Sequence, residues 1–350
     1  MKDWKELYEV ASRLESLKPW KYFEETDCFS INLPKYGGLY FCSIMGALGE
    51  SLTISVYKPQ EYQLLKTYME TNNNNQQSMQ VVRCFNCLSV EYSNRVYVPK
   101  ESCGVIKKIG LKFRDNNSWI YFENHTSGYM PCNLVVDEVI VLTQVLQHLF
   151  CQIKTCFVDN AMDVDFEKQV LYREYSKEKG IWLNFPVSDF PFPSLEFDVP
   201  ELTDEITLTK LKKKAYIADI EIDTLHFPMI PIEALPDGPN RKLEKQAYGQ
   251  VLLFVNHDDG KILYQETIWP EKFASEEYSK DYDEAWNLWD TFLQYVEDNG
   301  RPKNVYVRDL PHKFALYTTC EQLGIKLYVT DLPMCDNFEE RLLSVIRSMS

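Results

Sequence analysis

The spacing of apolar residues predicts the first helix. Apolar side chains recur every three or four positions near the start of the chain, at Trp4, Leu7, Tyr8, Ala11, Leu14 and Leu17. This is the period of an amphipathic helix. Lys18-Pro19 ends it, because a residue before proline avoids helical backbone angles. The chain therefore opens with a helix that packs one face on a core.

The segments after this helix predict a small mixed domain. Four apolar runs have the composition of strands: Leu39–Met45, Ser51–Tyr57, Gln80–Tyr92 and Val105–Phe113. The glycines of Gly46–Glu50 permit the positive φ angles of a tight hairpin between the first two runs. Two other segments are typical of helices, Gln60–Met69 and Leu134–Phe157.

Prolines mark the boundary between two predicted domains. A further strand is expected within Tyr172–Phe185, and four prolines then interrupt regular structure: Pro186, Pro191, Pro193 and Pro200. We therefore predict an N-terminal α+β domain over residues 1–160. An extra strand and a proline-rich connector follow over 161–212, and a C-terminal domain over 213–350.

The C-terminal pattern predicts three strands and then alternating helices and strands. The first strand is Tyr216–Asp223, and Asp258-Asp259-Gly260 is a hairpin signal between Gln250–Asn256 and Lys261–Ile268. A helix with an apolar face from Trp286 to Val296 comes next. After this helix, the pattern predicts a strand, a helix, a second strand and a last helix. A three-stranded meander followed by right-handed crossovers is the topology of an RNase H-like domain.

Composition and charge narrow the kind of protein. The chain has 350 residues, 45% of them hydrophobic, which is enough for two packed cores. Its formal charge of −15 repels a phosphate backbone, so nucleic acid is an unexpected partner. The apolar runs are too short for a membrane span, and no signal peptide follows Met1. A cytoplasmic protein that is not bound to a membrane is expected, and most of its ten cysteines are expected to be buried thiols and not disulfide partners.

Acidic residues near the C-terminus resemble those of a known class of domain. The segment from Gly300 to Asp309, then Phe314, Leu323–Lys326 and Asp336–Arg341, is similar to the end of a transposase or retroviral-type integrase core. In that class, three acids bind two divalent metal ions. The resemblance implies that Asp309 matches the second acid and Glu339 or Glu340 the third. Asp219 or Asp223 on the first strand would supply the first acid, and the metal would be Mg²⁺ or Mn²⁺.

The same acidic residues can also be explained by structural roles that need no metal ion. On an alternating strand, Asp219, Glu221 and Asp223 share one face, which is typical of a solvated surface. Asp336 and Glu339 have the spacing of a capping box, and Asp309 is placed to cap the helix after its strand. Leu310-Pro311 also stands where the resembled class has Asn-Gly. These readings favour a domain without catalysis.

The cysteines and histidines give a weaker signal. Cys84 and Cys87 have the spacing of half a zinc site, but structural zinc needs four ligands and no second pair follows. The five histidines share no pattern, and the known nucleophile, phosphate and dinucleotide motifs are absent. No catalytic residue and no cofactor is therefore assigned on these grounds.

The N-terminal half resembles a group of uncharacterised bacterial proteins. The residues that carry the resemblance are Trp4–Tyr8, Pro19-Trp20, and Met45-Gly46 through Gly49-Glu50. Proteins of this group pair such an N-terminal domain with a C-terminal domain like the one described above, and both are domains of unknown function. The resemblance implies a bacterial, cytoplasmic, two-domain protein and assigns no activity.

Two functions follow as expectations. The first is a non-catalytic binding protein with a degenerate RNase H-like domain, whose partner is another protein or a small ligand. The alternative is a metal-dependent nuclease or integrase-type phosphodiesterase with Asp219, Asp309 and Glu340 as ligands. A nuclease would gather its carboxylates within about 5 Å of shared metal, beside a basic rim. Lys212–Lys214, Arg301, Lys303 and Arg308 are the candidates for that rim.

Overall fold

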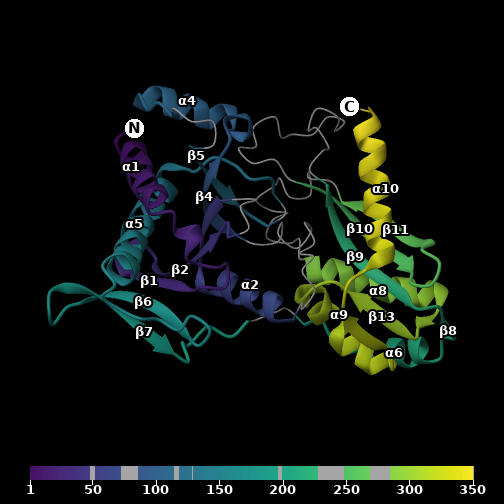
Figure 1. The fold of residues 1–350 in the computed structure, drawn as a ribbon. Helices are drawn as coiled ribbons and strands as arrows, with labels where there is room; N and C mark the ends of the chain where they lie inside the picture. Colours follow the sequence, from purple (N-terminus) through teal and green to yellow (C-terminus); the bar gives the residue numbers. More distant parts are fainter. Residues whose placement is uncertain are drawn as a thin grey trace. The chain divides into compact units, whose positions relative to one another are not determined.

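The chain divides into two compact units, each with its own sheet (Figure 1). The computed structural model describes residues 1–47, 52–71, 86–113, 118–127, 129–195, 199–227, 248–268 and 284–349. The fold is mixed α+β, with separate sheets in the N-terminal and C-terminal halves. The predicted loop Asn72–Gln77 and the residue Cys84 lie outside these ranges.

The N-terminal unit is built on a seven-stranded sheet in the order β5-β4-β3-β2-β1-β6-β7. All neighbouring strands are antiparallel except β1 and β6, which run parallel. The predicted hairpin is confirmed, since β2 pairs with β3. The strands are β1 Phe29–Leu33, β2 Gly38–Met45, β3 Leu52–Tyr57, β4 Cys87–Ser93, β5 Trp119–His125, β6 Gln169–Ser176 and β7 Ile181–Ser188.

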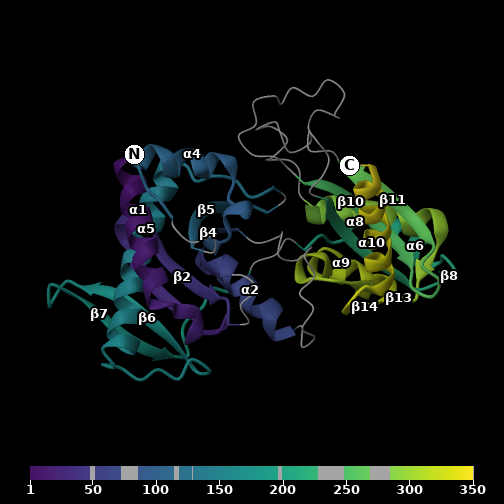
Figure 2. The ribbon, with the colours of Figure 1, turned by 45° about the horizontal axis from the view of Figure 1, so that its top comes forward.

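Two helices cover one face of this sheet. α1 (Lys2–Leu17) lies beside α5 (Val136–Ile153), as Figures 1 and 2 both show. Their apolar sides pack on a buried cluster that includes Phe29, Ile54 and Phe122. By length and composition the segment Val136–Val158 is also long enough to cross a membrane, but half of it is buried within the structure. We therefore assign it as the core helix of this unit.

Shorter helices complete the N-terminal unit. The α-helices are α2 Pro59–Thr71 and α4 Lys100–Ile109, and the 3-10 turns are η1 Pro19–Lys21, η2 Pro34–Tyr36 and η3 Arg95–Tyr97. A π-helical turn, η4 Lys154–Val158, continues α5. On the second face of the sheet, the ring of Phe41 packs against Tyr62 of α2 and against Phe190 and Phe192.

Two sequence predictions in this unit are corrected by the structure. The expected strand Val105–Phe113 is wrong, because most of it lies in α4 and the residues after it, with Gly110 at φ +75° as the helix C-cap. Its apolar residues also fit a helical period, which a short run cannot exclude. The single strand expected in Tyr172–Phe185 is a hairpin of β6 and β7, with a turn at Gly180.

His148 connects α5 to this hairpin through Arg173 and Trp182. Arg173 Nε donates to His148 Nδ1 over 3.0 Å, and the ring of Trp182 lies 3.9 Å from the imidazole. Burial, followed by the charge of Arg173, lowers the pKa of His148 to about 4. An unfolded histidine titrates near pH 6.5, so below that pH protons favour the unfolded chain.

We predict that His148 contributes to acid unfolding between about pH 6.5 and pH 4. Over this window the unfolding free energy of the N-terminal unit falls by about 1–3 kcal/mol, and the His148 contribution levels off below it. His148→Gln keeps an acceptor for Arg173 and removes the proton site, so its stability should fall less. Chemical denaturation at a series of pH values measures this, and parallel curves for both proteins would contradict it.

The C-terminal unit has a five-stranded sheet in the order β11-β10-β9-β13-β14. β9, β10 and β11 are antiparallel, whereas β13 runs parallel to both β9 and β14. A two-residue pair, β8 with β12, lies outside this sheet. The strands are β8 Tyr216–Ile217, β9 Ile220–Phe227, β10 Gly249–Asn256, β11 Ile262–Ile268, β12 Arg301–Pro302, β13 Asn304–Val307 and β14 Lys326–Val329.

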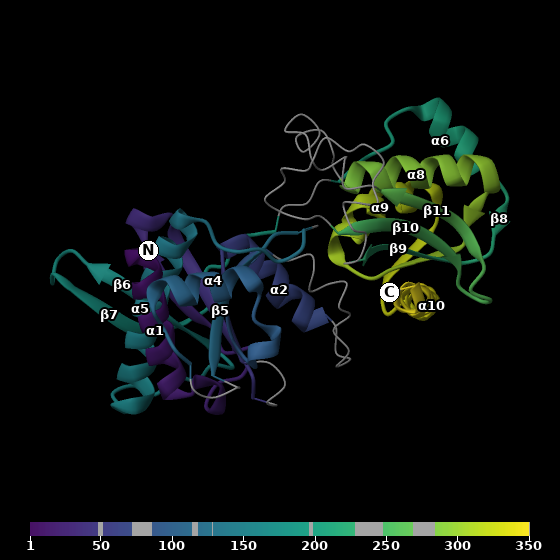
Figure 3. The ribbon, with the colours of Figure 1, turned by 90° about the horizontal axis from the view of Figure 1, so that it is seen from above.

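Helices cover both faces of this second sheet (Figure 3). α8 (Glu284–Asn299) and α9 (Leu310–Leu323) lie on one face with α6 (Glu205–Lys212), over a cluster that includes Ile222, Phe254 and Phe292. α10 (Pro333–Met349) lies on the other face, over Leu225 and Leu253. Among the described residues, and apart from β8 and β12, the order from β9 onward is three strands, helix, strand, helix, strand, helix, and β13 lies beside β9, as the sequence predicts.

Candidate functional site

The acidic face of β9 is buried beneath α10. Asp219, Glu221 and Asp223 alternate along the strand as expected, but Glu221 is 0% exposed and Asp223 is 2% exposed. Leu332 and Cys335, at the start of α10, are buried on the same side of the sheet. The interpretation of this face as solvated is therefore wrong for these two residues. Buried carboxylates need partners, so their contacts define what the face does.

Glu221 binds the first turn of α10. Its Oε2 accepts hydrogen bonds from the backbone N–H groups of Met334 and Cys335, each at 3.0 Å. Its Oε1 lies 2.9 Å from His257 Nδ1. Backbone N–H groups in the first turn of a helix have no partner within the helix, and the helix dipole favours a negative charge there. A strand residue thus performs the capping role that the sequence assigned to Asp336.

Arg308 joins two acids across the sheet and α10. It lies directly after β13, and its Nε donates to Asp223 over 2.9 Å while Nη2 reaches Asp336 over 2.6 Å. The side chain of Arg308 is only 6% exposed. Burial alone lowers its pKa, but the charges of Asp223 and Asp336 outweigh burial and raise the pKa above the usual value. The guanidinium group is therefore a fixed cation between carboxylates.

Asp309 caps α9 and orients a buried histidine. Its Oδ1 accepts from the backbone N–H of His312 at 2.8 Å and lies 2.7 Å from His312 Nδ1. Burial raises the pKa of Asp309, but the charge and hydrogen bonds of His312 outweigh it and lower the pKa. His312 Nε2 lies 2.9 Å from Thr224 Oγ1. This order resembles an acid–base–nucleophile relay, but Thr224 is 3% exposed, so its hydroxyl is closed to solvent in this structure.

The three acids of the nuclease alternative are not brought together. Asp219 accepts from the backbone and side chain of Asn304, at the start of β13, whereas Asp309 follows the end of that strand. Asn304, which binds Asp219, and Asp309 are five residues apart along the chain, which is roughly 16 Å at about 3.3 Å per residue of strand. Glu340 is an exposed residue of α10. Asp223, the other candidate for the first acid, lies on β9 beside the end of β13 that leads to Asp309, as the resemblance requires. However, its carboxylate is bound to Arg308.

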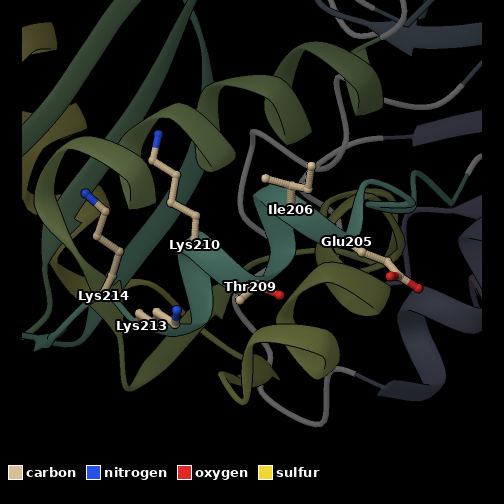
Figure 4. A pocket seen from close by; sticks show the side chains of 6 residues that line it. All are labelled: Glu205, Ile206, Thr209, Lys210, Lys213 and Lys214. Atoms are coloured by element: carbon tan, nitrogen blue, oxygen red, sulfur yellow. The ribbon is translucent and has the colours of Figure 1, made fainter.

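Three members of the expected basic rim, Lys214, Arg301 and Arg308, are held by structural contacts. Lys214 follows α6 and lies with Lys210 of that helix along a surface hollow of about 750 Å³ (Figure 4). Both bind Glu297, Lys210 at the carboxylate and Lys214 at the backbone carbonyl. Arg301 donates to the carbonyls of Lys214 and Leu323. The two lysines stabilise the carboxyl end of α8 and Arg301 the carboxyl end of α9, at the end of the sheet away from Asp309.

A polar cavity opens at one end of the N-terminal sheet. Its volume is about 410 Å³, and β2, β3, β4, β5 and the first turn of α5 contribute to its wall. Val56, Leu88 and Val141 supply apolar surface. The polar residues are Tyr40, Lys58, Glu61, Asn86, Asn124, His125, Thr126, Asp137 and Glu138. An apolar surface with a few convergent polar groups is typical of a small-molecule site.

The polar groups of the cavity are held by a network within the protein. Glu61 accepts from Asn86 Nδ2 over 2.8 Å, and Lys58 Nζ donates to Tyr40 Oη over 2.9 Å. Asn124 donates to Glu138, which also accepts from the backbone N–H of Val135. Three carboxylates therefore face one lysine around the cavity, Glu61, Asp137 and Glu138 against Lys58.

Next to this cavity, two glutamates and a histidine converge on β4 and β5. Glu91, Glu123 and His125 each offer a ligand atom, and these atoms all lie within 4.8 Å of one another. Burial lowers the pKa of His125 to about 4. Burial, followed by the charge of Glu91, raises the pKa of Glu123 to about 7. Across the described ranges no other group of three such side chains converges in this way.

The sequence signal for this cluster was period-two alternation on two neighbouring strands. Ser89 and Glu91 alternate on β4, and Glu123 and His125 alternate on β5, where Ser89 lies opposite Glu123. The pairing of the strands could not be known from the sequence. Cys87 lies opposite His125 on the same strands, and burial raises the pKa of its thiol to about 12. Its proposed zinc partner Cys84 lies outside the described residues.

Comparisons with known families match both halves of the chain. Residues 4–173 match the model of a domain of unknown function, DUF7309. Residues 207–343 match the model of a second domain of unknown function, DUF6930. The protein therefore combines two domains of unknown function, as the resemblance implied, and neither match shows RNase H-like homology. No curated protein and no solved structure matched the chain.

Proposed function

We propose that this protein is a non-catalytic binding protein whose C-terminal domain has an RNase H-like fold without a metal centre. The strand order β11-β10-β9-β13-β14, with β13 parallel to β9, supports the fold. One observation carries the lack of catalysis: the guanidinium group of Arg308 lies between Asp223 and Asp336. It supplies the positive charge that a metal would otherwise bring to these acids.

The alternative, a phosphodiesterase that uses Mg²⁺ or Mn²⁺, requires Asp309 to bind metal. Asp309→Asn separates the two functions, because asparagine caps a helix about as well as aspartate but is a poorer metal ligand. We expect Asp309→Asn to leave unchanged any rise of melting temperature caused by millimolar Mg²⁺ or Mn²⁺. We also expect no cleavage of a labelled DNA or RNA oligonucleotide by the wild-type protein.

A metal-dependent rise that disappears in Asp309→Asn, together with oligonucleotide cleavage, would refute the non-catalytic assignment. Asp290→Asn in α8 is the control for a general effect of removing one acidic charge.

The ligand proposed for this binding protein is a small polar molecule with a cationic group. It is assigned to the N-terminal cavity, because a volume of about 410 Å³ suits a metabolite. Glu61, Asp137 and Glu138 outnumber Lys58 around it, so a positive charge is favoured. The exposed carboxylate of Asp137 and the apolar surface of Val141 would contact the two ends of such a molecule.

Arginine and agmatine are suitable probes of this cavity, with glutamate as the anionic comparison. We expect the two cations to raise the melting temperature of the wild-type protein and glutamate to leave it unchanged. The rise should be smaller in Glu61→Gln and Asp137→Asn, while Glu101→Gln, on the exposed side of α4, should behave as wild type. Equal shifts with glutamate, or shifts that survive in both cavity variants, would refute this ligand class.

A further inference from the structure

Glu91, Glu123 and His125 form a side-chain cluster beside the proposed ligand cavity, and of the three only His125 lines that cavity. The two glutamates come from neighbouring strands, and Glu123 Oε2 lies 3.7 Å from His125 Nε2. Two carboxylates this close repel each other when both are ionised. In the part of the chain that the structure describes, neither glutamate forms an ion pair with lysine or arginine. A bound cation would remove this repulsion.

The donors fit a divalent transition metal. Carboxylate oxygens and a neutral imidazole nitrogen bind Zn²⁺ at about 2.0–2.2 Å. Ligand atoms around such an ion are separated by roughly 3.4 Å in tetrahedral geometry. Glu123 Oε2 and His125 Nε2 lie 3.7 Å apart and all three ligand atoms lie within 4.8 Å of one another, so binding would draw them closer together. Three protein ligands also leave one position open for water or a substrate atom. The site is thus of the open type and not of the closed structural type.

A neighbouring side chain holds one of the ligands in place. Thr53 Oγ1 donates to Glu91 Oε2 over 2.6 Å, and such an outer contact fixes the orientation of a metal ligand and raises affinity. Ser89 Oγ lies 3.1 Å from His125 Nε2, the nitrogen that would bind the ion, so the metal would replace this contact. The side chains of His125 and Glu123 keep 29% and 20% of their surface exposed, so an ion can reach them from solvent.

We propose that Glu91, Glu123 and His125 bind one divalent transition-metal ion, Zn²⁺ or Mn²⁺, on the face of the N-terminal sheet. His125 also lines the polar cavity, so the metal would lie at the edge of the proposed ligand site. The metal site does not depend on the cationic ligand. If arginine and agmatine do not bind, the metal-site proposal still stands. If no metal binds, the proposal of a cationic ligand still stands.

Titration calorimetry of the full-length protein with Zn²⁺ and with Mn²⁺ tests the site. We expect a stoichiometry of one ion per chain for at least one metal. Glu123→Gln and His125→Ala should each weaken binding by at least about 10-fold, and Thr53→Val should weaken it by about 10-fold through the lost contact to Glu91. Glu101→Gln, an exposed acid on α4, should bind as wild type does.

A spectroscopic measurement keeps the test independent of the variants' folding. Co²⁺ added to the wild-type chain should give visible absorption bands of a nitrogen and oxygen site with low coordination number, and Zn²⁺ should displace it. The proposal is overturned if the wild-type protein binds neither metal at millimolar concentration. It is also overturned if folded Glu123→Gln and His125→Ala, checked by circular dichroism, bind as tightly as Glu101→Gln.

Discussion

Replacing Arg308 by methionine is expected to destabilise the C-terminal domain by about 3–5 kcal/mol. Methionine nearly fills the same volume but leaves Asp223, which is 2% exposed, as a buried carboxylate without its cation. It also removes the link from β13 to Asp336 on α10. Hydrogen exchange of peptides from β9 and β13 measures this loss within the domain, and denaturant unfolding gives its size.

The control for this substitution is Lys303→Met, at an exposed position just before β13. It should change stability by less than about 0.5 kcal/mol. Asp223→Leu added to Arg308→Met should recover most of the loss, because replacing both members of a buried ion pair with apolar groups is often neutral. If Arg308→Met exchanges no faster than Lys303→Met, the ion network does not stabilise the domain.

Much of the C-terminal fold could be predicted from the chain because its signals are local. Asp258-Asp259-Gly260 marks the hairpin between β10 and β11, and Gly300 marks the end of α8. Asp309 is predicted and observed as the cap of α9. Each of these features depends on residues within one turn or one strand, so neighbours in sequence determine it.

The partners of the buried acids could not be predicted, because they come from distant segments. Glu221 binds backbone groups of Met334 and Cys335, more than a hundred residues later. The alternation of β9 correctly places its acids on one face, but it cannot tell whether water or α10 covers that face. A charged strand is usually solvated, and here helix N–H groups and Arg308 compensate for burial.

The N-terminal cluster was missed for the same reason. Glu91 lies in the predicted strand Gln80–Tyr92, but no strand was predicted at Trp119–His125, which carries Glu123 and follows a helix. The expected strand Val105–Phe113 would have stood between them and hidden their pairing. Once α4 is recognised as a helix, β4 and β5 become neighbours, and Ser89 lies opposite Glu123. One wrong strand and one missed strand therefore concealed the best candidate for metal binding.

Replacing Glu221 by alanine is expected to cost the C-terminal domain about 2–4 kcal/mol. The substitution leaves the N–H groups of Met334 and Cys335, one part-buried and one buried, without an acceptor and removes the partner of His257. Glu221→Gln keeps one acceptor oxygen and the shape of the side chain, so a loss of about 1 kcal/mol is expected. Denaturant unfolding compares the variants, and hydrogen exchange at the first turn of α10 localises the effect.

Glu340→Ala on the same helix distinguishes a capping role from a metal-binding role. Glu340 is exposed, so its loss should change stability by less than about 0.5 kcal/mol with or without Mg²⁺. If acids of β9 and α10 instead shared a metal ion, Glu340→Ala would remove a metal-dependent stabilisation and Glu221→Ala would not open the first turn of α10. Under the capping role, Glu221→Ala speeds exchange at the first turn of α10 and Glu340→Ala does not, because Glu340 lies two turns further along the helix. Under the metal-binding role, only Glu340→Ala has an effect, and this effect depends on the metal.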